Sequence, residues 1–428
     1  MNKIYINPEQ KEWQILLQRP VLDHTALKAT VSAILSDVQL RGDAAVLAYT
    51  KQFDGTELNN LVVTKAEIAA APDLVDVDLR KAIELAKTNI TKFHTAQKES
   101  IIKIETTRGV VCYRKSVAIE KVGLYIPGGT APLFSTLLML GIPAVLAGCK
   151  EITVCTAPDK NGNVPPIILF VANLIGIDKV YKASGVQAIA AMAFGTETIP
   201  ATYKIFGPGN QYVTCAKQMV NAMGIAIDMP AGPSELAIYA DESCNPGFVA
   251  ADLLSQAEHG LDSQVVLVTT QASIAEKVQQ EIEKQSADLP RKEIVIASLT
   301  NSRMIVMENP NDAFTLLNEY APEHLIIASD NAESLAELVI NAGSVFLGHY
   351  SPESAGDYAS GTNHTLPTNG FAKVYSGVSM DSFVKKITFQ QLTKQGIQEI
   401  GHAVELMAAA EGLEAHKKAV TLRLNENQ

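Results

Sequence analysis

The chain has 428 residues, 47% of them hydrophobic, and a formal net charge of −11. This length and hydrophobic content suffice for about two to four domains with buried cores. The acidic balance argues against a nucleic-acid partner, because binding phosphate groups requires clustered Lys and Arg.

Five scattered cysteines form no CxxC pair. They predict reduced thiols in a cytoplasmic protein, and neither a disulfide framework nor a cysteine-based zinc site. The amino terminus lacks the apolar run of a signal peptide. The most apolar stretches, 137–149 and 164–177, contain proline and are too short to span a bilayer. We therefore expect a soluble, cytoplasmic protein without a membrane partner.

Residues 1 to about 100 are predicted to be mostly helical. An amphipathic stretch at 26–55 stops at Gly55, and a second helical stretch follows at 79–97. Because neither stretch carries recognisable chemistry, we expect this region to be a scaffold or a subunit contact.

From about residue 120, short apolar strands alternate with helices. In the first round we expect strands at 151–157, 179–184, 204–207 and 225–229, and helices at 165–176, 186–195 and 211–224. In the second round we expect strands at 264–270, 293–298, 304–308, 325–330 and 344–348, and helices at 273–287, before Tyr320 and at 331–342. This alternation implies parallel sheets covered on both faces. We therefore predict an α/β fold with two Rossmann-like parallel-sheet units, joined near 229–235, and helical N- and C-terminal segments.

Side chains of the kind that bind metals recur in the C-terminal half, at element ends or in turns. They are Gln256, His259, Glu323, His324, Asp357, His364, Glu411 and His416. Oxygen and imidazole ligands without cysteine suit a catalytic zinc that keeps an open coordination position. The pattern therefore indicates an enzyme.

Gln256 and His259 are predicted to share one face at the end of a helix. Asn245 and Pro246 provide an N-cap and a first helical residue, and the helix should stop at Gly260. Two donors aimed together from a helix end form a plausible half of a metal site. The alternative is a surface histidine that interacts favourably with the helix dipole.

Glu323 and His324 lie between a helix ending near Tyr320 and the strand at 325–330. An adjacent carboxylate and imidazole can activate water and move protons, although a salt-bridged turn is the simpler interpretation. A long polar loop at 351–364 follows a strand, where α/β sheets bind ligands. Asp357 in it is a hard oxygen ligand, and His364 is a ligand or a substrate contact; a solvated surface loop is the alternative.

The tail at 381–422 is predicted to be helical, either folding back onto its own core or reaching a partner subunit. It carries Glu411 and His416, which are five residues apart and so about 140° apart around an ideal helix. They share a face only if the helix ends or bends between them, which Gly412 permits.

Three turns that contain glycine are candidates for binding a dinucleotide. They lie at 123–135, 184–187 and 207–210. The last two lie between a strand and a helix, where backbone N–H groups can hold a phosphate. No GxGxxG follows a strand, so the alternative is that these glycines only permit tight turns.

Several long segments together resemble the histidinol dehydrogenase family. They are GLYIPGGTAPLFSTLLML, GVQAIAAMAFGTE, IFGPGNQYVT, AIDMPAGPSE, DLLSQAEHG, PEHL, SVFLGHYSPESAGDYASGTNH and AHKKAVTLR. The resemblance covers roughly residues 105–425 in the same order and spacing. It implies zinc- and NAD-dependent oxidation of L-histidinol to L-histidine through a bound histidinaldehyde, with reduction of two NAD.

The resemblance also implies a role for each candidate residue. Zinc would be held by Gln256, His259, Asp357 and His416, and Glu323 and His324 would be the catalytic pair. The substrate would contact those six residues together with Ser234, Glu411 and His364. NAD would contact Tyr125, Gln187 and Asn210. In the family, the segment with Glu411 and His416 comes from the neighbouring subunit, which implies a homodimer with shared active sites.

The predicted division into domains follows from these roles. It comprises a segment at 1–22 that packs with the C-terminal helices, a metal-binding and catalytic α/β domain of 23–124 plus 236–378, an NAD-contacting α/β domain of 125–235, and a C-terminal helical segment at 379–428. Three other functions remain open at this point. One is oxidation of another small polar alcohol by a member of the same family, and the second is hydrolysis by a zinc enzyme that uses Glu323 to activate water. The third is a non-catalytic metal-binding scaffold, which needs neither Glu323 nor His324.

Overall fold

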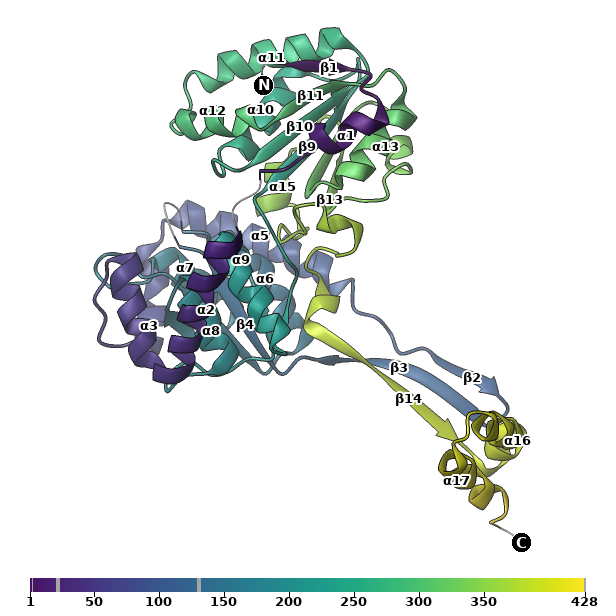
Figure 1. Ribbon diagram of the computed structural model, residues 1–428. Coiled ribbons are helices and arrows are strands. Elements are labelled where there is room, and N and C mark those ends of the chain that lie inside the picture. Colours follow the sequence, from purple (N-terminus) through teal and green to yellow (C-terminus); the bar gives the residue numbers. More distant parts are fainter. Residues whose placement is uncertain (2, 21–23, 129–131, 427–428) are drawn as a thin grey trace.

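Two parallel sheets and one antiparallel sheet organise the chain. The computed structural model describes residues 1, 3–20, 24–128 and 132–426. Each parallel sheet forms the centre of one α/β body, and the antiparallel sheet extends away from both bodies as an arm that ends in two helices (Figure 1). The prediction of an α/β fold with two Rossmann-like parallel-sheet units is confirmed.

The smaller parallel sheet has the strand order β6-β5-β4-β7-β8. Its strands are β4 (Lys121–Ile126), β5 (Glu151–Thr156), β6 (Val180–Lys182), β7 (Lys204–Phe206) and β8 (Ala226–Ile227). The helices between them are α6 (Phe134–Ala147), α7 (Pro166–Ile175), α8 (Gly185–Phe194) and α9 (Gln211–Ala222). The chain starts in the centre at β4, winds outward to β6, and returns to continue on the other side of β4. This is the doubly wound arrangement of Rossmann-like sheets.

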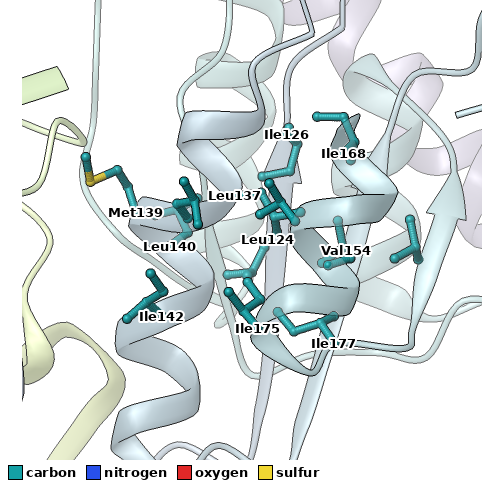
Figure 2. Packing of buried hydrophobic residues seen from close by; sticks show 14 of the residues in the cluster. Leu124, Ile126, Leu137, Met139, Leu140, Ile142, Val154, Ile168, Ile175 and Ile177 are labelled. Atoms are coloured by element: carbon teal, nitrogen blue, oxygen red, sulfur yellow. The ribbon is translucent and has the colours of Figure 1, made fainter. Parts of the chain in front are cut away.

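Apolar residues on β4 and on the helices of one face form a continuous core. Leu124 and Ile126 of β4 pack with Leu137 of α6 and with Ile168 and Ile175 of α7 (Figure 2). These side chains are almost completely buried, and each buried aliphatic side chain of this size contributes about 1.5–3 kcal/mol of hydrophobic free energy. The core therefore holds α6 and α7 firmly against the sheet.

Helices from the N-terminal part of the chain also cover this sheet. They are α2 (His24–Arg41), α3 (Asp43–Tyr49), the π-helix η1 (Thr50–Asp54), α4 (Lys65–Ala70), the short 3-10 helix η2 (Ala71–Leu74) and α5 (Val77–Thr95). Helix α2 packs on α8 and α9, and α5 packs on α6. The predicted division placed 23–124 with 236–378, whereas this packing places the described N-terminal helices on the sheet of β4–β8. They cover it because Val31, Leu35 and Val38 of α2 are buried against α8.

The larger parallel sheet has the strand order β1-β11-β10-β9-β12-β13. Its strands are β1 (Ile4–Ile6), β9 (Glu235–Ala240), β10 (Gln264–Thr269), β11 (Arg303–Val306), β12 (His324–Ala328) and β13 (Ser344–Leu347). Its helices are α1 (Gln10–Leu16), α10 (Pro246–Ala257), α11 (Ala272–Ser286), α12 (Lys292–Thr300), α13 (Pro310–Tyr320) and α14 (Ala332–Ala336). The winding of β9 to β13 repeats that of β4 to β8, and β1 is added at the edge.

The N-terminal segment belongs to this larger sheet. Strand β1 pairs in parallel with β11, and Trp13 and Leu17 are buried in the core between the sheet and α13. The segment at 1–22 was predicted to pack with the C-terminal helices, but its described residues pack here. The alternating IYI sequence can complete a sheet edge, and the apolar side chains after it cover one face.

The strand predicted at 293–298 is wrong, because these residues lie in α12. Its buried residues are Val295, Ser298 and Leu299. They occupy positions i, i+3 and i+4, which lie on one face of a helix. A short apolar run cannot be assigned by its period alone. The packing against α10 decides the outcome here.

The arm consists of β2 (Lys103–Thr107), β3 (Val110–Ala118) and β14 (Val384–Leu392), in the order β14-β3-β2. It ends in α16 (Lys394–Ala410) and α17 (Glu414–Leu424), at the far end from both bodies (Figure 1). The tail was predicted to be helical from 381 onward, and this is wrong for 384–392. That segment pairs with β3 along its whole length. Because β3 lies far earlier in the chain, the residues around 384–392 do not reveal this pairing.

Short elements and cysteines complete the description. The chain between β13 and the arm contains α15 (Glu353–Tyr358), η3 (Phe371–Lys373) and η4 (Met380–Phe383). All five cysteines lie within the described residues and have free thiols, as predicted. None of the helices in the described part of the chain is both long enough and apolar enough to cross a membrane.

Candidate active site

Most of the predicted metal and catalytic residues meet at the amino ends of β9 and β12. Strand β12 begins at His324 and pairs with β9, which begins at Glu235. Helix α10 runs back from the other end of β9 and ends at Ala257, which brings Gln256 and His259 to the same edge. Helix α15 brings Asp357, and it lies at the junction of the two bodies (Figure 1). The strands β9 and β12 and the helices α10 and α15 therefore converge at this edge.

The loop at 351–364 does not lie where sequence reasoning put it. It was expected at the carboxyl edge of the sheet, the usual ligand-binding edge. Although it follows β13, it places Asp357 Oδ1 at 3.7 Å from Nε2 of His324, the first residue of β12. The loop is also partly helical, because α15 starts at Glu353. The site therefore forms between the two bodies, where the second body can close it.

Three side chains form a cluster with the geometry of a metal site. One ligand atom from each of His259, Glu353 and Asp357 lies within 4.8 Å of the other two. An imidazole with two carboxylates is a donor set that zinc accepts, with Gln256 close by as a further oxygen donor. The residues present therefore fit a divalent cation. Glu353 was not among the predicted residues.

A helical spacing would have identified Glu353. It is four residues before Asp357, and both face the same side of α15. The glycine and serine residues of 351–364 favour an irregular loop, and this composition hides the helical spacing of Glu353 and Asp357. Glu353 is only 2% exposed, and a carboxylate is buried in this way only where it has a partner or a function.

The ring of His324 is oriented as a proton acceptor. Its Nδ1 lies 3.3 Å from the carbonyl oxygen of Glu235, and because a carbonyl can only accept, Nδ1 carries the ring proton. Its Nε2 is buried and has no hydrogen-bond partner among the described residues. The free lone pair of Nε2 therefore faces the site.

Glu323 is held beside this ring. The backbone N–H of Glu235 donates to Oε2 of Glu323 at 2.9 Å, and the same Oε2 lies 3.8 Å from Nδ1 of His324. Both residues are more than nine-tenths buried. The predicted catalytic pair is thus adjacent in space as well as in sequence, and the first residue of β9 fixes both members.

Burial moves the acid–base properties of the site away from ordinary values. It lowers the pKa of His324 to about 3 and that of His364 to about 4. It raises the pKa of Glu323 well above its usual range, and it raises the pKa of Asp357 to about 7. Histidines kept neutral beside carboxyl groups with raised pKa values are typical of sites that transfer protons.

An ion pair that sequence reasoning missed supports the catalytic pair from behind. Arg19 donates through Nε and Nη2 to the two carboxylate oxygens of Glu235, at 2.5 and 2.8 Å. Its Nη2 also donates to the carbonyl oxygen of Tyr320, and its guanidinium lies over the Tyr320 ring. Glu235 therefore has its side chain fixed by Arg19 while its backbone holds Glu323 and His324. No local pattern marks a pair so distant in sequence.

His364 connects the cluster to the smaller body. Its Nδ1 lies 3.0 Å from the carbonyl oxygen of Asp357, and its Nε2 lies 3.3 Å from Oγ1 of Thr136 in α6. Beside it, the side-chain nitrogen of Asn363 donates to the carbonyl oxygen of Met139. Ser234 lies directly before β9, next to Glu235, and so at the same edge. Both predicted substrate contacts therefore border the cluster.

Glu411 and His416 are not brought to the cluster within one chain. They lie at the junction of α16 and α17, at the end of the arm remote from α15 (Figure 1). Helix α16 ends before Glu411, and Gly412 has a positive φ of 73°, so the chain turns between the two residues. Both side chains are exposed. The helix thus ends between the two residues, as Gly412 permits, and the arm can present this turn to another molecule.

The residues predicted to contact NAD gather at the carboxyl edge of the smaller sheet. Tyr125 lies at the end of β4, and its hydroxyl accepts the backbone N–H of Gly185. Gln187 in α8 is fully buried, and neither atom of its amide has a partner among the described residues. Asn210 caps α9 by accepting from the N–H groups of Tyr212 and Val213. Residues 129–131 of the first glycine turn lie outside the described residues.

This edge can accept a polar ligand. An unpartnered buried amide such as that of Gln187 needs a partner, and the N-termini of α8 and α9 favour negative charge. Gly207 is required here, because a Cβ would collide with the carbonyl oxygen of Tyr125. The arrangement fits a dinucleotide phosphate bound over β4 and β7.

A buried ion pair fixes the turn at 207–210. Lys217 Nζ lies 2.5 Å from Asp228 Oδ1 and donates to the carbonyl oxygen of Gly207, whose N–H donates to Asp228 Oδ2. We expect Lys217→Met to lower the free energy of unfolding by about 3–5 kcal/mol, because it leaves the carboxylate of Asp228 buried without its cation. Denaturant unfolding measures this loss.

The matched control is Lys284→Met, which breaks an exposed ion pair with Glu281. Exposed pairs contribute at most about 1 kcal/mol. If both variants lost the same free energy of unfolding, the buried pair of Lys217 and Asp228 would not stabilise the protein more than an exposed pair does.

Comparison with known proteins identifies the family of the chain. The sequence profile of the histidinol dehydrogenase family matches residues 17–424. The chain is 59% identical over 425 residues to a histidinol dehydrogenase of Bacteroides thetaiotaomicron, covering 99% of both chains. It is 50% identical over 414 residues to one of Aliivibrio fischeri, covering 96% of this chain and 93% of that relative.

A solved structure gives the same result. The crystal structure of histidinol dehydrogenase from Elizabethkingia anophelis is 57% identical in sequence and matches with a TM-score of 0.97, covering 99% of this chain and 98% of that one. The match spans both bodies and the arm. The chain therefore belongs to the histidinol dehydrogenase family of oxidoreductases.

Proposed function

We propose that this protein oxidises L-histidinol to L-histidine through a bound histidinaldehyde, with reduction of two NAD and with zinc in the site. The observation that carries the proposal is the geometry of His324. Its unpartnered, buried Nε2 faces a cluster of metal-type ligands in a chain of the histidinol dehydrogenase family. An alcohol oxidation needs a proton acceptor placed in this way.

Zinc would be held by Gln256, His259 and Asp357 of one subunit and by His416 of its partner. Imidazole, carboxylate and amide donors without cysteine are a donor set that suits it. When bound, zinc would supply a template that holds the substrate nitrogens and fixes the alcohol carbon against the nicotinamide. Ser234, His364 and the partner's Glu411 would complete the substrate contacts.

The protein side chains carry the proton transfers. In the first oxidation, His324 takes the hydroxyl proton at Nε2 while a hydride leaves the alcohol carbon for NAD. The product is the aldehyde. In the second, Glu323 removes a proton from water as it adds to the aldehyde, and a second hydride leaves the hydrate for a second NAD. His324, having released its first proton to solvent, takes the remaining hydroxyl proton, and the carboxylate results.

Tyr125, Gln187 and Asn210 would hold NAD at the carboxyl edge of the smaller sheet. We propose a homodimer, because Glu411 and His416 lie on an arm that cannot serve the cluster of its own chain. A site between subunits would also retain the aldehyde. The absence of a nucleic-acid partner and the cytoplasmic location stay predictions from charge and cysteine content.

The test is the amount of NADH formed from a limiting amount of L-histidinol. We expect two NADH per histidinol, loss of the reaction with a chelator, and recovery on adding zinc. Formation of one NADH would contradict the four-electron reaction. Zinc and NAD binding without turnover of histidinol would favour another small polar alcohol as substrate.

The roles of the catalytic pair predict a selective defect in Glu323→Gln. This variant should retain most of the first oxidation, because His324 is intact. It should lose about 10²–10⁴-fold in the aldehyde step, because the amide cannot take a proton from water. Rates measured separately with histidinol and histidinaldehyde distinguish the two steps. Equal losses in both would overturn this division of roles.

A further inference from the structure

Glu353 contacts two functional side chains, yet the proposed reaction assigns it no role. It is the first residue of α15, one turn before Asp357. Its carboxylate is 2% exposed and lies between Gln256 of α10 and His324 of β12. A carboxylate buried at this position needs a reason, because an unpaired buried charge is strongly unfavourable.

The amide of Gln256 is oriented by this carboxylate. Gln256 is completely buried. One terminal atom of its side-chain amide lies 3.2 Å from Oε2 of Glu353 and also contacts Oε1, and these contacts are hydrogen bonds only when that atom is the nitrogen. A carboxylate only accepts hydrogen bonds, so the opposite orientation would place the amide oxygen against two other oxygens. The oxygen of Gln256 is therefore directed away from Glu353 and is free to bind a cation.

The same carboxylate contacts the ring of His324. Oε1 of Glu353 lies 3.4 Å from Nδ1, the atom that also faces the carbonyl oxygen of Glu235 at 3.3 Å. Two acceptors on this side of the ring both favour a proton on Nδ1. The lone pair of the ring therefore stays on Nε2, toward the site.

We propose that Glu353 is a positioning residue that sets the direction of two neighbours at once. It turns the oxygen of Gln256 toward the zinc and the proton-free nitrogen of His324 toward the substrate. This inference rests on the proposed function, because it takes Gln256 as a zinc ligand. Partners of this kind determine metal affinity without binding the metal themselves.

The inference differs from a simpler role in which Glu353 itself binds the metal. Its carboxylate oxygen does lie within 4.8 Å of ligand atoms of His259 and Asp357. The contacts favour positioning, because both oxygens of Glu353 face the amide of Gln256 and Oε1 also faces Nδ1 of His324, and the lone pairs used there are not available to a cation. The two roles predict opposite results when the partners are exchanged.

The test is an exchange of the two side chains, read as zinc affinity by competition with a chromophoric chelator. Glu353→Gln should weaken zinc binding about 10–100-fold, because an amide at 353 no longer dictates the orientation of Gln256. Gln256→Glu should weaken it by a similar factor, because two carboxylates then face each other. The double variant Gln256→Glu/Glu353→Gln restores one donor and one acceptor, and its zinc affinity should return to within about threefold of wild type.

Each outcome decides the inference. Losses of zinc affinity that add up in the double variant would overturn the inference. It would also be overturned if Gln256→Glu bound zinc as tightly as wild type, because this result is expected if Glu353 binds the metal directly. Glu333→Gln, the same change at an exposed carboxylate of the same body, should bind zinc like wild type. Circular dichroism of each metal-free variant shows that it is folded. If wild-type protein itself binds no zinc, the proposed function fails first, whereas normal wild-type binding with unaffected variants refutes only the role of Glu353.

Discussion

Replacing His324 with glutamine should slow both oxidations of L-histidinol by about 10²–10⁴-fold while zinc and NAD still bind. Glutamine can keep the contact that Nδ1 makes with the carbonyl oxygen of Glu235. It cannot accept a proton where Nε2 stands. Because both oxidations remove a hydroxyl proton, both should be affected. Separate rate measurements with histidinol and histidinaldehyde, together with zinc content, test this expectation.

The pH dependence provides a second check on His324. Burial lowers the pKa of its ring to about 3, so the wild-type base stays unprotonated over the neutral range. In the variant, hydroxide must take the proton, so the ratio of the variant rate to the wild-type rate should rise about tenfold per pH unit. His402→Gln, at a histidine exposed on α16, should behave like wild type. A small, pH-independent loss in the His324 variant would show that another group is the base.

The sequence predicted the parts of the site that depend on local patterns. Asn245 and Pro246 start α10 as expected, and the side chain of Asn245 accepts from Gly247 and Phe248. Helix α13 ends at Tyr320 as expected, and Glu323 lies between this helix and β12, which begins one residue earlier than expected, at His324. Such signals lie within a few residues of the feature that they predict. Their physical cause is equally local.

The sequence could not predict the parts that depend on long-range pairing. Strand β14 forms because β3, much earlier in the chain, offers an edge along its whole length. Arg19 supports the site only because β9 places Glu235 beside it. Glu353 joins the cluster because α15 is helical, whereas its glycine- and serine-containing sequence favours a loop. In each case the structure is stabilised by contacts with residues that are distant in the sequence, and neighbouring residues do not indicate these contacts.

The second large effect is expected for the arm. His416→Asn should weaken zinc binding more than about 100-fold, because it removes a proposed ligand, and even partners outside the coordination shell change affinity by about 10–100-fold. The side chain is exposed and remote from α15 in its own chain. Folding of the variant should therefore be unaffected, which thermal unfolding of the metal-free protein measures.

Mixed dimers decide whether His416 acts across the subunit boundary. A dimer of one Glu323→Gln subunit and one His416→Asn subunit, isolated through two different tags, contains one site with both changes and one with neither. It should oxidise histidinaldehyde at about half of the wild-type rate, because one of its two sites is intact. A dimer of Glu323→Gln and His259→Asn subunits should stay inactive in this aldehyde step, because both changes lie in the same body and each site carries one of them. If both mixed dimers were inactive, His416 would have to act in the site of its own subunit. The arm would then have to bring His416 to α15 of the same chain.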